Sequence, residues 1–191
     1  MLISVSPAGA LSADYMIFPN GTAYRASIEI TDTSQYEFVD TGILGEPVPL
    51  IVGEVQLSGN CSPCRFNTTS PSFTSNLMTL TFERGDYIVS YVSALHDNHL
   101  QVSFKNPYHV NITLPQEFAV QNPLLAGISP GANVTRFADN TTLIQWNRTM
   151  SADLRFYDMD REALLYFFLQ FMGILAVVML LPFLITMRKK K

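Results

Sequence analysis

The sequence lacks the motifs by which most enzymes are identified. Its 191 residues contain no Gly-x-Ser-x-Gly, no His-Glu-x-x-His and no phosphate-binding loop. Acidic residues such as Glu117, Asp139 and Asp153 are scattered, so no pair for general acid–base catalysis can be chosen. We therefore expect a protein that is not an enzyme and that holds no cofactor.

Cysteine is nearly absent. Cys61 and Cys64 form the one Cys-x-x-Cys pair, and they lie in a stretch rich in Ser, Thr, Asn and Pro, residues 58–76, that we expect to be a loop. Outside the cell such a pair normally oxidises, so we expect a disulfide. A thiol-exchange centre and half of a shared metal site remain alternatives. Zinc needs four ligands, and no second pair is present.

Histidine is also scarce, and its pattern indicates turns rather than metal. His96-Asp97-Asn98-His99 has turn-forming residues at its centre, and His109 stands alone. Arg84-Gly85-Asp86 is the tripeptide that animal adhesion receptors recognise. Gly and Asp are also what the backbone of a hairpin tip requires, and we expect such a tip there. We predict no metal site.

A basic excess is missing outside the C-terminus. Residues 1–163 hold eight Lys and Arg against all 16 Asp and Glu, a net charge of −8, which disfavours nucleic acid as a partner. Residues 1–15 also have neither a basic start nor an apolar stretch of signal-peptide length. That absence conflicts with an exported domain, and a tail-anchored protein with a cytoplasmic domain is the alternative.

One long apolar run is present at the C-terminus. The 24 residues from Leu164 to Met187 carry no charge, and Arg188, Lys189, Lys190 and Lys191 follow them. As a helix the run would be roughly 36 Å long, which exceeds the ~30 Å hydrocarbon core of a bilayer. We predict a transmembrane helix over 164–187, with the lipid bilayer as partner and 188–191 as a basic cytoplasmic tail.

Charge on the two sides of this run predicts its orientation. Basic flanks stay in the cytoplasm, whereas the acidic flank with Asp158, Asp160 and Glu162 is expected outside. The prediction is one pass through the cell membrane, with the N-terminal domain outside and the C-terminus cytoplasmic.

A polar and small-residue pattern runs along the predicted helix. Gln170, Gly173 and Ala176 are three residues apart and share one stripe, which would let another helix approach closely. A lone Gln reached by water near the interface is the alternative.

Asn-x-Ser/Thr sequons are unusually frequent. Roughly four times more are present than the Ser and Thr content would give by chance, and all precede the apolar run. They begin at Asn20, Asn60, Asn67, Asn111, Asn133, Asn140 and Asn147. We predict N-glycosylation, and hence a domain with wet surfaces outside the cell.

Short alternating apolar segments fill the rest of the chain. In 24–31, Ala26, Ile28 and Ile30 alternate with polar residues, as in a half-buried strand. Further strands are expected at 36–39, 50–57, 77–82, 87–92, 100–104, 108–114, 134–137, 143–146 and 154–157. The fold prediction is all-β: an extracytoplasmic β-sandwich of about nine short strands over 21–158. An N-terminal segment, 1–20, precedes it, and a juxtamembrane joint, 159–163, leads to the single helix.

Four stretches carry a resemblance to a known family. They are Gly85-Asp86-Tyr87-Ile88-Val89-Ser90-Tyr91, Leu114-Pro115, Asn122-Pro123-Leu124-Leu125-Ala126-Gly127-Ile128-Ser129-Pro130-Gly131, and Leu154-Arg155-Phe156-Tyr157-Asp158 with Arg161-Glu162. On these residues the chain resembles an uncharacterised archaeal family of membrane-anchored envelope proteins, a domain of unknown function. The resemblance covers 80–191 and implies an archaeal surface location, but it brings no catalytic residues.

These patterns together predict a membrane-anchored, N-glycosylated envelope protein that acts as a structural or protein-interaction module. Its partners would be other envelope or membrane proteins. Two alternatives remain open. The protein could be an accessory subunit of a membrane complex, docked through the Gln170, Gly173 and Ala176 stripe, or a tethered thiol redox protein that uses Cys61 and Cys64.

Overall fold

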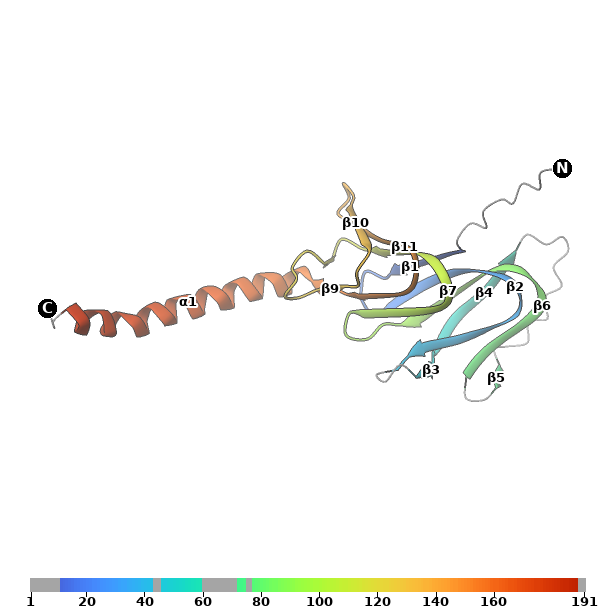
Figure 1. The fold of residues 1–191 in the computed structure, drawn as a ribbon, viewed down its shortest axis with the longest axis horizontal. Helices are drawn as coiled ribbons and strands as arrows, with labels where there is room; N and C mark the ends of the chain where they lie inside the picture. Colours follow the sequence, from blue (N-terminus) through green and yellow to red (C-terminus); the bar gives the residue numbers. More distant parts are fainter. Residues whose placement is uncertain (1–10, 43–45, 60–71, 75–76, 189–191) are drawn as a thin grey trace, which may run out of the picture.

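The computed structural model describes residues 11–42, 46–59, 72–74 and 77–188 of the chain. Within these residues twelve strands precede one long helix, which projects from the end of the β domain (Figure 1). The elements are β1 (Leu11–Ile17), β2 (Ala23–Thr41), β3 (Pro47–Pro49), β4 (Val52–Gly59), β5 (Ser72–Thr74), β6 (Leu77–Ala94), β7 (His99–Leu114), β8 (Phe118–Ala119), β9 (Gly127–Ile128), β10 (Ala132–Arg136), β11 (Thr142–Arg155), β12 (Tyr157–Asp158) and α1 (Met159–Arg188).

The fold class predicted from the sequence, a β domain followed by one C-terminal helix, is confirmed. Seven strands form the main path of a sheet in the order β10-β11-β7-β1-β2-β6-β4, with β3, β5 and β9 added at its sides. Neighbours are antiparallel except β1 and β7, which run parallel. β1, which lies in the expected N-terminal segment, is therefore a central strand of the sheet.

The strands are longer than the prediction of about nine short ones allowed. Segments expected to be separate, such as 24–31 and 36–39, merge into one strand, β2, of 19 residues. The same happens in β6, where Arg84-Gly85-Asp86 lies inside the strand, so the expected hairpin tip at this tripeptide is wrong. In β7 the Asn106-Pro107 dipeptide is likewise internal. β5 also lies within the stretch expected to be a loop.

Irregular pairing bends the long strands. The register shifts near Asp32 in β2 and near Arg148 in β11, and both residues have left-handed backbones, with φ of 50° and 57°. Such bulges add a residue to one strand and increase its curvature. Pro107 cannot donate a ladder hydrogen bond, which weakens pairing at the bend of β7. The two halves of each long strand can therefore belong to different layers.

The bends fold the sheet over its own inner face. The halves of β2 and β7 that pair with β1 form the central part, together with the parts of β6 and β11 next to them. The other halves of β2 and β7 pair with the remaining parts of β6 and β11 and form two arms. One hydrophobic core contains side chains from both the central part and the arms. Ala26, Ile28 and Ile30 are buried in this core, as their alternation predicted. The core is thus closed by extensions of its own strands.

Truncating a side chain in the central part should be costly. Ile112 of β7 is fully buried, so Ile112→Ala should lower the free energy of unfolding by about 2–5 kcal/mol. Ile88→Ala is the matched control, because Ile88 is 38% exposed and should cost less than about 1.5 kcal/mol. Urea unfolding of the full chain in detergent, followed by Trp146 fluorescence, measures both. Equal losses would contradict this placement of the core.

Candidate functional site

The β domain is joined to α1 by a packed seam, formed by 156–158 and 118–119. Phe156 and Tyr157 each have 1% of their surface exposed. The Phe156 ring meets the Phe118 ring edge to face at 4.9 Å, and β12 pairs with β8 next to it. The backbone N–H of Phe156 donates to the carbonyl of Asn98 at 3.0 Å. These contacts hold the last strands against the body of the domain.

The helix follows this seam without a gap. It begins at Met159, so the residues expected to form a joint, 159–163, are its first turns. Asp160 and Glu162 lie in the first turn, where negative charge is favourable to the helix dipole. The Tyr157 hydroxyl donates to the Glu162 carboxylate and accepts from the backbone N–H of Asn122, both at 3.2 Å. One tyrosine therefore connects the helix, the seam and the 122–126 turn.

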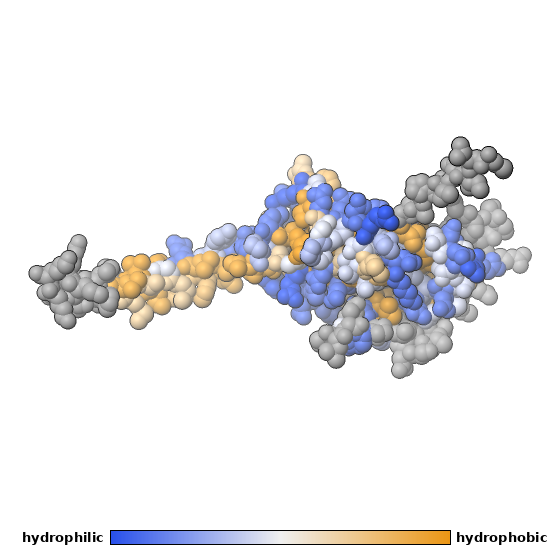
Figure 2. All heavy atoms as spheres, in the orientation of Figure 1, coloured by the Kyte–Doolittle hydropathy of each residue, from blue (hydrophilic) through white to orange (hydrophobic). Residues whose placement is uncertain are grey.

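The helix itself is uncovered. It is the one helix in the described part of the chain long and apolar enough to cross a membrane, over Met159–Leu180. Every residue from Tyr166 to Leu180 is exposed, and the apolar surface of the shaft is visible in Figure 2. A helix buried in the core of a soluble domain would show the opposite pattern. The structure thus separates a polar β domain from an apolar stalk.

A cleft of about 510 Å³ opens between the two arms of the sheet. The described part of β1 starts at Leu11, and its neighbours β2 and β7 continue past that level. Among the described residues, 33–37 of β2 have β6 as their strand partner, and 100–103 of β7 have β11. The Gln35 backbone bonds the Thr33 hydroxyl, and the Phe38 carbonyl accepts from the N–H of Leu50. Six consecutive residues of β7, 101–106, line the cleft, which shows that an edge of the strand faces it. Within the described residues, the cleft therefore lies in line with β1, between β2 and β7.

Tyrosines form the floor of this cleft. Tyr15, Tyr24, Tyr36, Tyr91 and Tyr108 all line it. The rings of Tyr24 and Tyr91, and of Tyr36 and Tyr91, lie 6.4 Å apart. Burial raises the pKa of Tyr15, Tyr36 and Tyr91, and raises the pKa of Tyr24 to about 12. These phenols therefore stay neutral at physiological pH and keep their O–H groups.

The rim of the cleft is polar and mainly acidic. Three carboxylates, Glu37, Asp40 and Glu46, line it together with one ammonium group, Lys105. Hydroxyl and amide side chains also line the cleft, among them Thr33, Gln35, Gln101, Ser103 and Asn106. Aromatic surface with a few polar groups around it is typical of a binding site.

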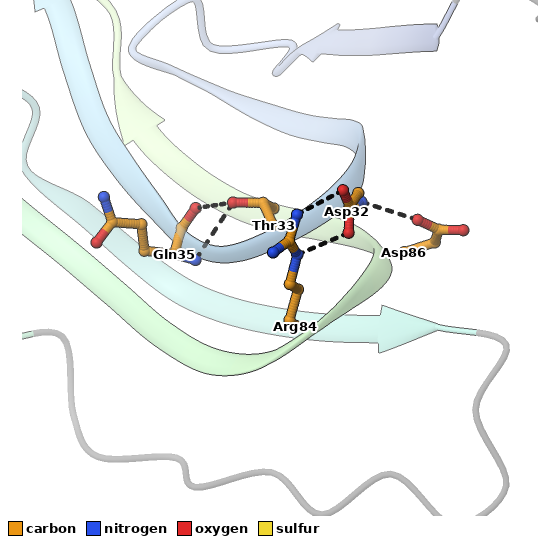
Figure 3. Close-up of polar contacts among 5 residues, drawn as sticks. All are labelled: Asp32, Thr33, Gln35, Arg84 and Asp86. Atoms are coloured by element: carbon orange, nitrogen blue, oxygen red, sulfur yellow. Dashed lines mark hydrogen bonds and ion pairs between the residues drawn. The ribbon is translucent and has the colours of Figure 1, made fainter.

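A cluster of polar contacts holds the bend of β2 at one end of the cleft (Figure 3). The Asp32 carboxylate accepts two 2.7 Å hydrogen bonds from Arg84. The backbone N–H of Asp32 donates to the Asp86 carboxylate. The Arg84 guanidinium beside Asp32 lowers the pKa of that carboxyl. The Thr33 hydroxyl donates to the Gln35 carbonyl at 2.9 Å. The Arg84-Gly85-Asp86 tripeptide thus fixes a bend in the sheet.

The sequons fall in different environments. Asn20, Asn133, Asn140 and Asn147 are exposed, and the last three lie on β10, on β11 and in the turn between them. Asn111 is half-buried in the middle of the sheet. Its amide nitrogen donates to Asp14 at 2.8 Å, and its oxygen accepts from Gln145 at 3.0 Å. Asn60 and Asn67 lie outside the described residues.

Other predicted sites are placed less completely. Cys61, Cys64 and Lys189, Lys190, Lys191 lie outside the described residues, so the disulfide and the basic tail beyond Arg188 stay predictions. Gln170, Gly173 and Ala176 are exposed on α1, and a Cβ added at Gly173 would meet nothing within 4 Å. The stripe is therefore open to a partner helix.

The histidine motif forms the turn that its residues predicted. His96 and His99 are paired, and Asp97 and Asn98 between them have φ of 55° and 51°. His99 Nε2 lies 3.2 Å from the Asp153 carboxylate. Among the described residues no group of three or more His, Cys, Asp or Glu side chains could hold a metal ion.

No sequence pattern predicted the cleft. Its residues come mainly from β1, β2, β6 and β7, which are far apart in the chain, and its floor is made by tertiary contacts. One signal was present: Tyr15, Tyr24 and Tyr91 each occupy an inward position of an alternating segment, where an aliphatic residue is more usual.

The environments of the sequons predict unequal glycan occupancy. Asn20, Asn133, Asn140 and Asn147 should carry glycans, because they are exposed and their amide nitrogens make no hydrogen bond within the described part of the chain. Asn111 should not, because its half-buried amide nitrogen, to which a glycan would be attached, already donates to Asp14 within the sheet. Mass spectrometry of glycopeptides from the native host checks this. Occupancy at Asn111 equal to that at Asn133 would count against it.

Comparison with known proteins extends the similarity over almost the whole chain. The model of DUF5803, a family of unknown function, matches residues 12–189. This match includes β2 to β5 and nearly all of β1, for which the sequence alone had suggested no relative. No curated protein matches the chain. Because one family model spans both the β domain and the helix, the chain belongs to the DUF5803 family.

Proposed function

We propose that this protein is a single-pass, N-glycosylated protein of the archaeal cell envelope, with its β domain outside the cell. One observation carries the proposal: a helix of 30 residues leaves the β domain, and every residue of it from Tyr166 to Leu180 is exposed. Apolar surface of this extent is stable in lipid and costly in water. The archaeal surface location follows the resemblance described above.

Charge supports the orientation. Arg188, Lys189, Lys190 and Lys191 follow the apolar run, whereas Asp158, Asp160 and Glu162 precede it. Basic residues are retained on the cytoplasmic side. The seven sequons all lie on the other side of the helix, where glycosylation would occur.

We infer that the domain acts by binding, as an interaction module for another envelope or membrane protein. Within the described part of the chain, the cleft lies between residues 100–103 of β7 and a short stretch of β2, 36–37, neither of which has a strand partner on the cleft side. An extended segment of a partner would pair with these edges, as in recognition by strand addition. Its side chains would meet the tyrosine floor and the acidic rim, so a segment with apolar and basic residues fits best.

Two other functions make different predictions for variants. A subunit docked through Gln170, Gly173 and Ala176 would be released from a membrane complex by Gly173→Leu, while cleft variants would have no effect. A thiol redox protein would lose activity with Cys61→Ser and Cys64→Ser but keep its fold.

Orientation is tested on intact cells. A protease that cannot enter the cell should degrade the β domain and leave only α1 and the tail, detected by an epitope tag placed after Lys191. Lysed cells, in which both sides of the membrane are accessible, are the control. Survival of the full-length chain on intact cells, with degradation only after lysis, would contradict the proposal.

Binding through the cleft is tested by site-specific photo-crosslinking in intact cells. A crosslinking residue in place of Ser103, which lines the cleft on β7, should capture one partner protein. Ser151 is the matched control, because it is exposed and pairs with Ser103 across the strand ladder but does not line the cleft. The same partner captured equally from both positions, or from neither, would rule out binding in the cleft.

A further inference from the structure

A tight turn lies beside the first turn of α1. The backbone carbonyl of Asn122 accepts hydrogen bonds from the N–H groups of Leu125 and Ala126. The side-chain oxygen of Asn122 accepts from the N–H of Leu124 at 3.0 Å. The N–H of Asn122 in turn donates to the Tyr157 hydroxyl, which donates to Glu162 of α1. The turn 122–126 is therefore fixed to the base of the helix. Figure 1 shows β9, which follows this turn, at the same end of the domain as the start of α1.

Leu124 at the tip of this turn is strongly exposed. It is 77% exposed, although it belongs to a turn held by four hydrogen bonds. A single exposed leucine is ordinary on a protein surface. This leucine, however, lies beside the base of α1, where an exposed apolar side chain could contact the same membrane as the helix.

The depth of the 122–126 turn in a membrane can be inferred from its contact with α1. Glu162, which shares the Tyr157 hydroxyl with Asn122, precedes the first residue of the uncharged run, Leu164, by two positions. Two helical residues correspond to about 3 Å along the axis. The headgroup layer on each side of a bilayer is roughly 5–8 Å thick. The turn therefore lies at headgroup depth when the uncharged run fills the hydrocarbon core.

A hollow at the helix base is different in character from this turn. Glu117, Asp158 and Asp160 line it together with Asn20, whose sequon would add a glycan. Carboxylates and a glycan keep the hollow hydrated. The turn, by contrast, offers the exposed apolar side chain of Leu124 to lipid.

We propose that the 122–126 turn is a second membrane contact, in which Leu124 enters the outer leaflet of the bilayer beside α1. The inference rests on the proposed membrane anchoring, and its ligand is the lipid surface itself. With two contacts, the β domain lies against the membrane on one side instead of standing free on its helix. The cleft then has a fixed height and direction above the bilayer.

Tryptophan fluorescence in vesicles tests the contact. The full chain is reconstituted into phosphatidylcholine vesicles with acyl chains brominated close to the headgroup, which quench nearby tryptophan. Trp146 is 2% exposed and is present in every variant, so each variant is compared with the parent chain. Leu124→Trp should lose roughly half of its added emission, since tryptophan settles at the membrane interface.

Two further variants separate the possible failures. Tyr166→Trp in α1 reports whether the helix is in the bilayer at all. Ser34→Trp is the control for an exposed residue away from the membrane, because the bend of β2 lies at the opposite end of the domain from α1 (Figure 1). Far-UV circular dichroism verifies that each variant is folded.

The outcomes are distinct. Quenching of Leu124→Trp and Tyr166→Trp, but not of Ser34→Trp, is the expected result. Quenching of Tyr166→Trp alone overturns the second contact and leaves the membrane anchor standing. No quenching of Tyr166→Trp overturns the proposed function itself. Equal quenching of Ser34→Trp overturns the inference, because it shows that proximity to lipid is not specific to the turn.

Discussion

Uncovered apolar surface on α1 is the constraint on which the rest of the structure depends. From Tyr166 to Leu180 the residues are exposed, and each large apolar side chain left in water forgoes about 1.5–3 kcal/mol of burial. The β domain does not cover them, because its own core is already closed by the arms of the sheet. A membrane surface, with lipid around α1 and water around the β domain, is the environment that would satisfy both halves of the chain. The Tyr157 hydroxyl then matters because it connects the two halves at their boundary.

Bending of the long strands is the second organising feature. Because β2, β6, β7 and β11 extend from the central part into the arms, one sheet supplies both faces of its own core. Within the described residues, β2 and β7 also continue beyond the level of Leu11, and the cleft lies between them. A surface suited to binding therefore arises from the device that closes the core. Exposed sequons on β10 and β11 would place glycans near the β10 edge of the sheet, where an uncovered strand would invite aggregation.

Sequence patterns predicted the fold class and the helix because both depend on local periodicity. The uncharged run and the alternation of Ala26, Ile28 and Ile30 are local properties. Strand continuity was not predictable, because Pro107 and Gly85 are typical of turns, and only pairing with neighbours keeps them inside strands. β1 was overlooked for the same reason, since its short alternation gains its meaning from β2 and β7. The cleft and the 122–126 turn depend on contacts between distant residues.

The most direct measurement of the central claim is extraction of membranes at alkaline pH. It compares the full chain with a chain that ends at Asp158, before α1. The account predicts that the full chain stays in the membrane pellet and that the shortened chain is released. Release of the full chain would show that the apolar helix is not embedded in lipid, and would contradict the account.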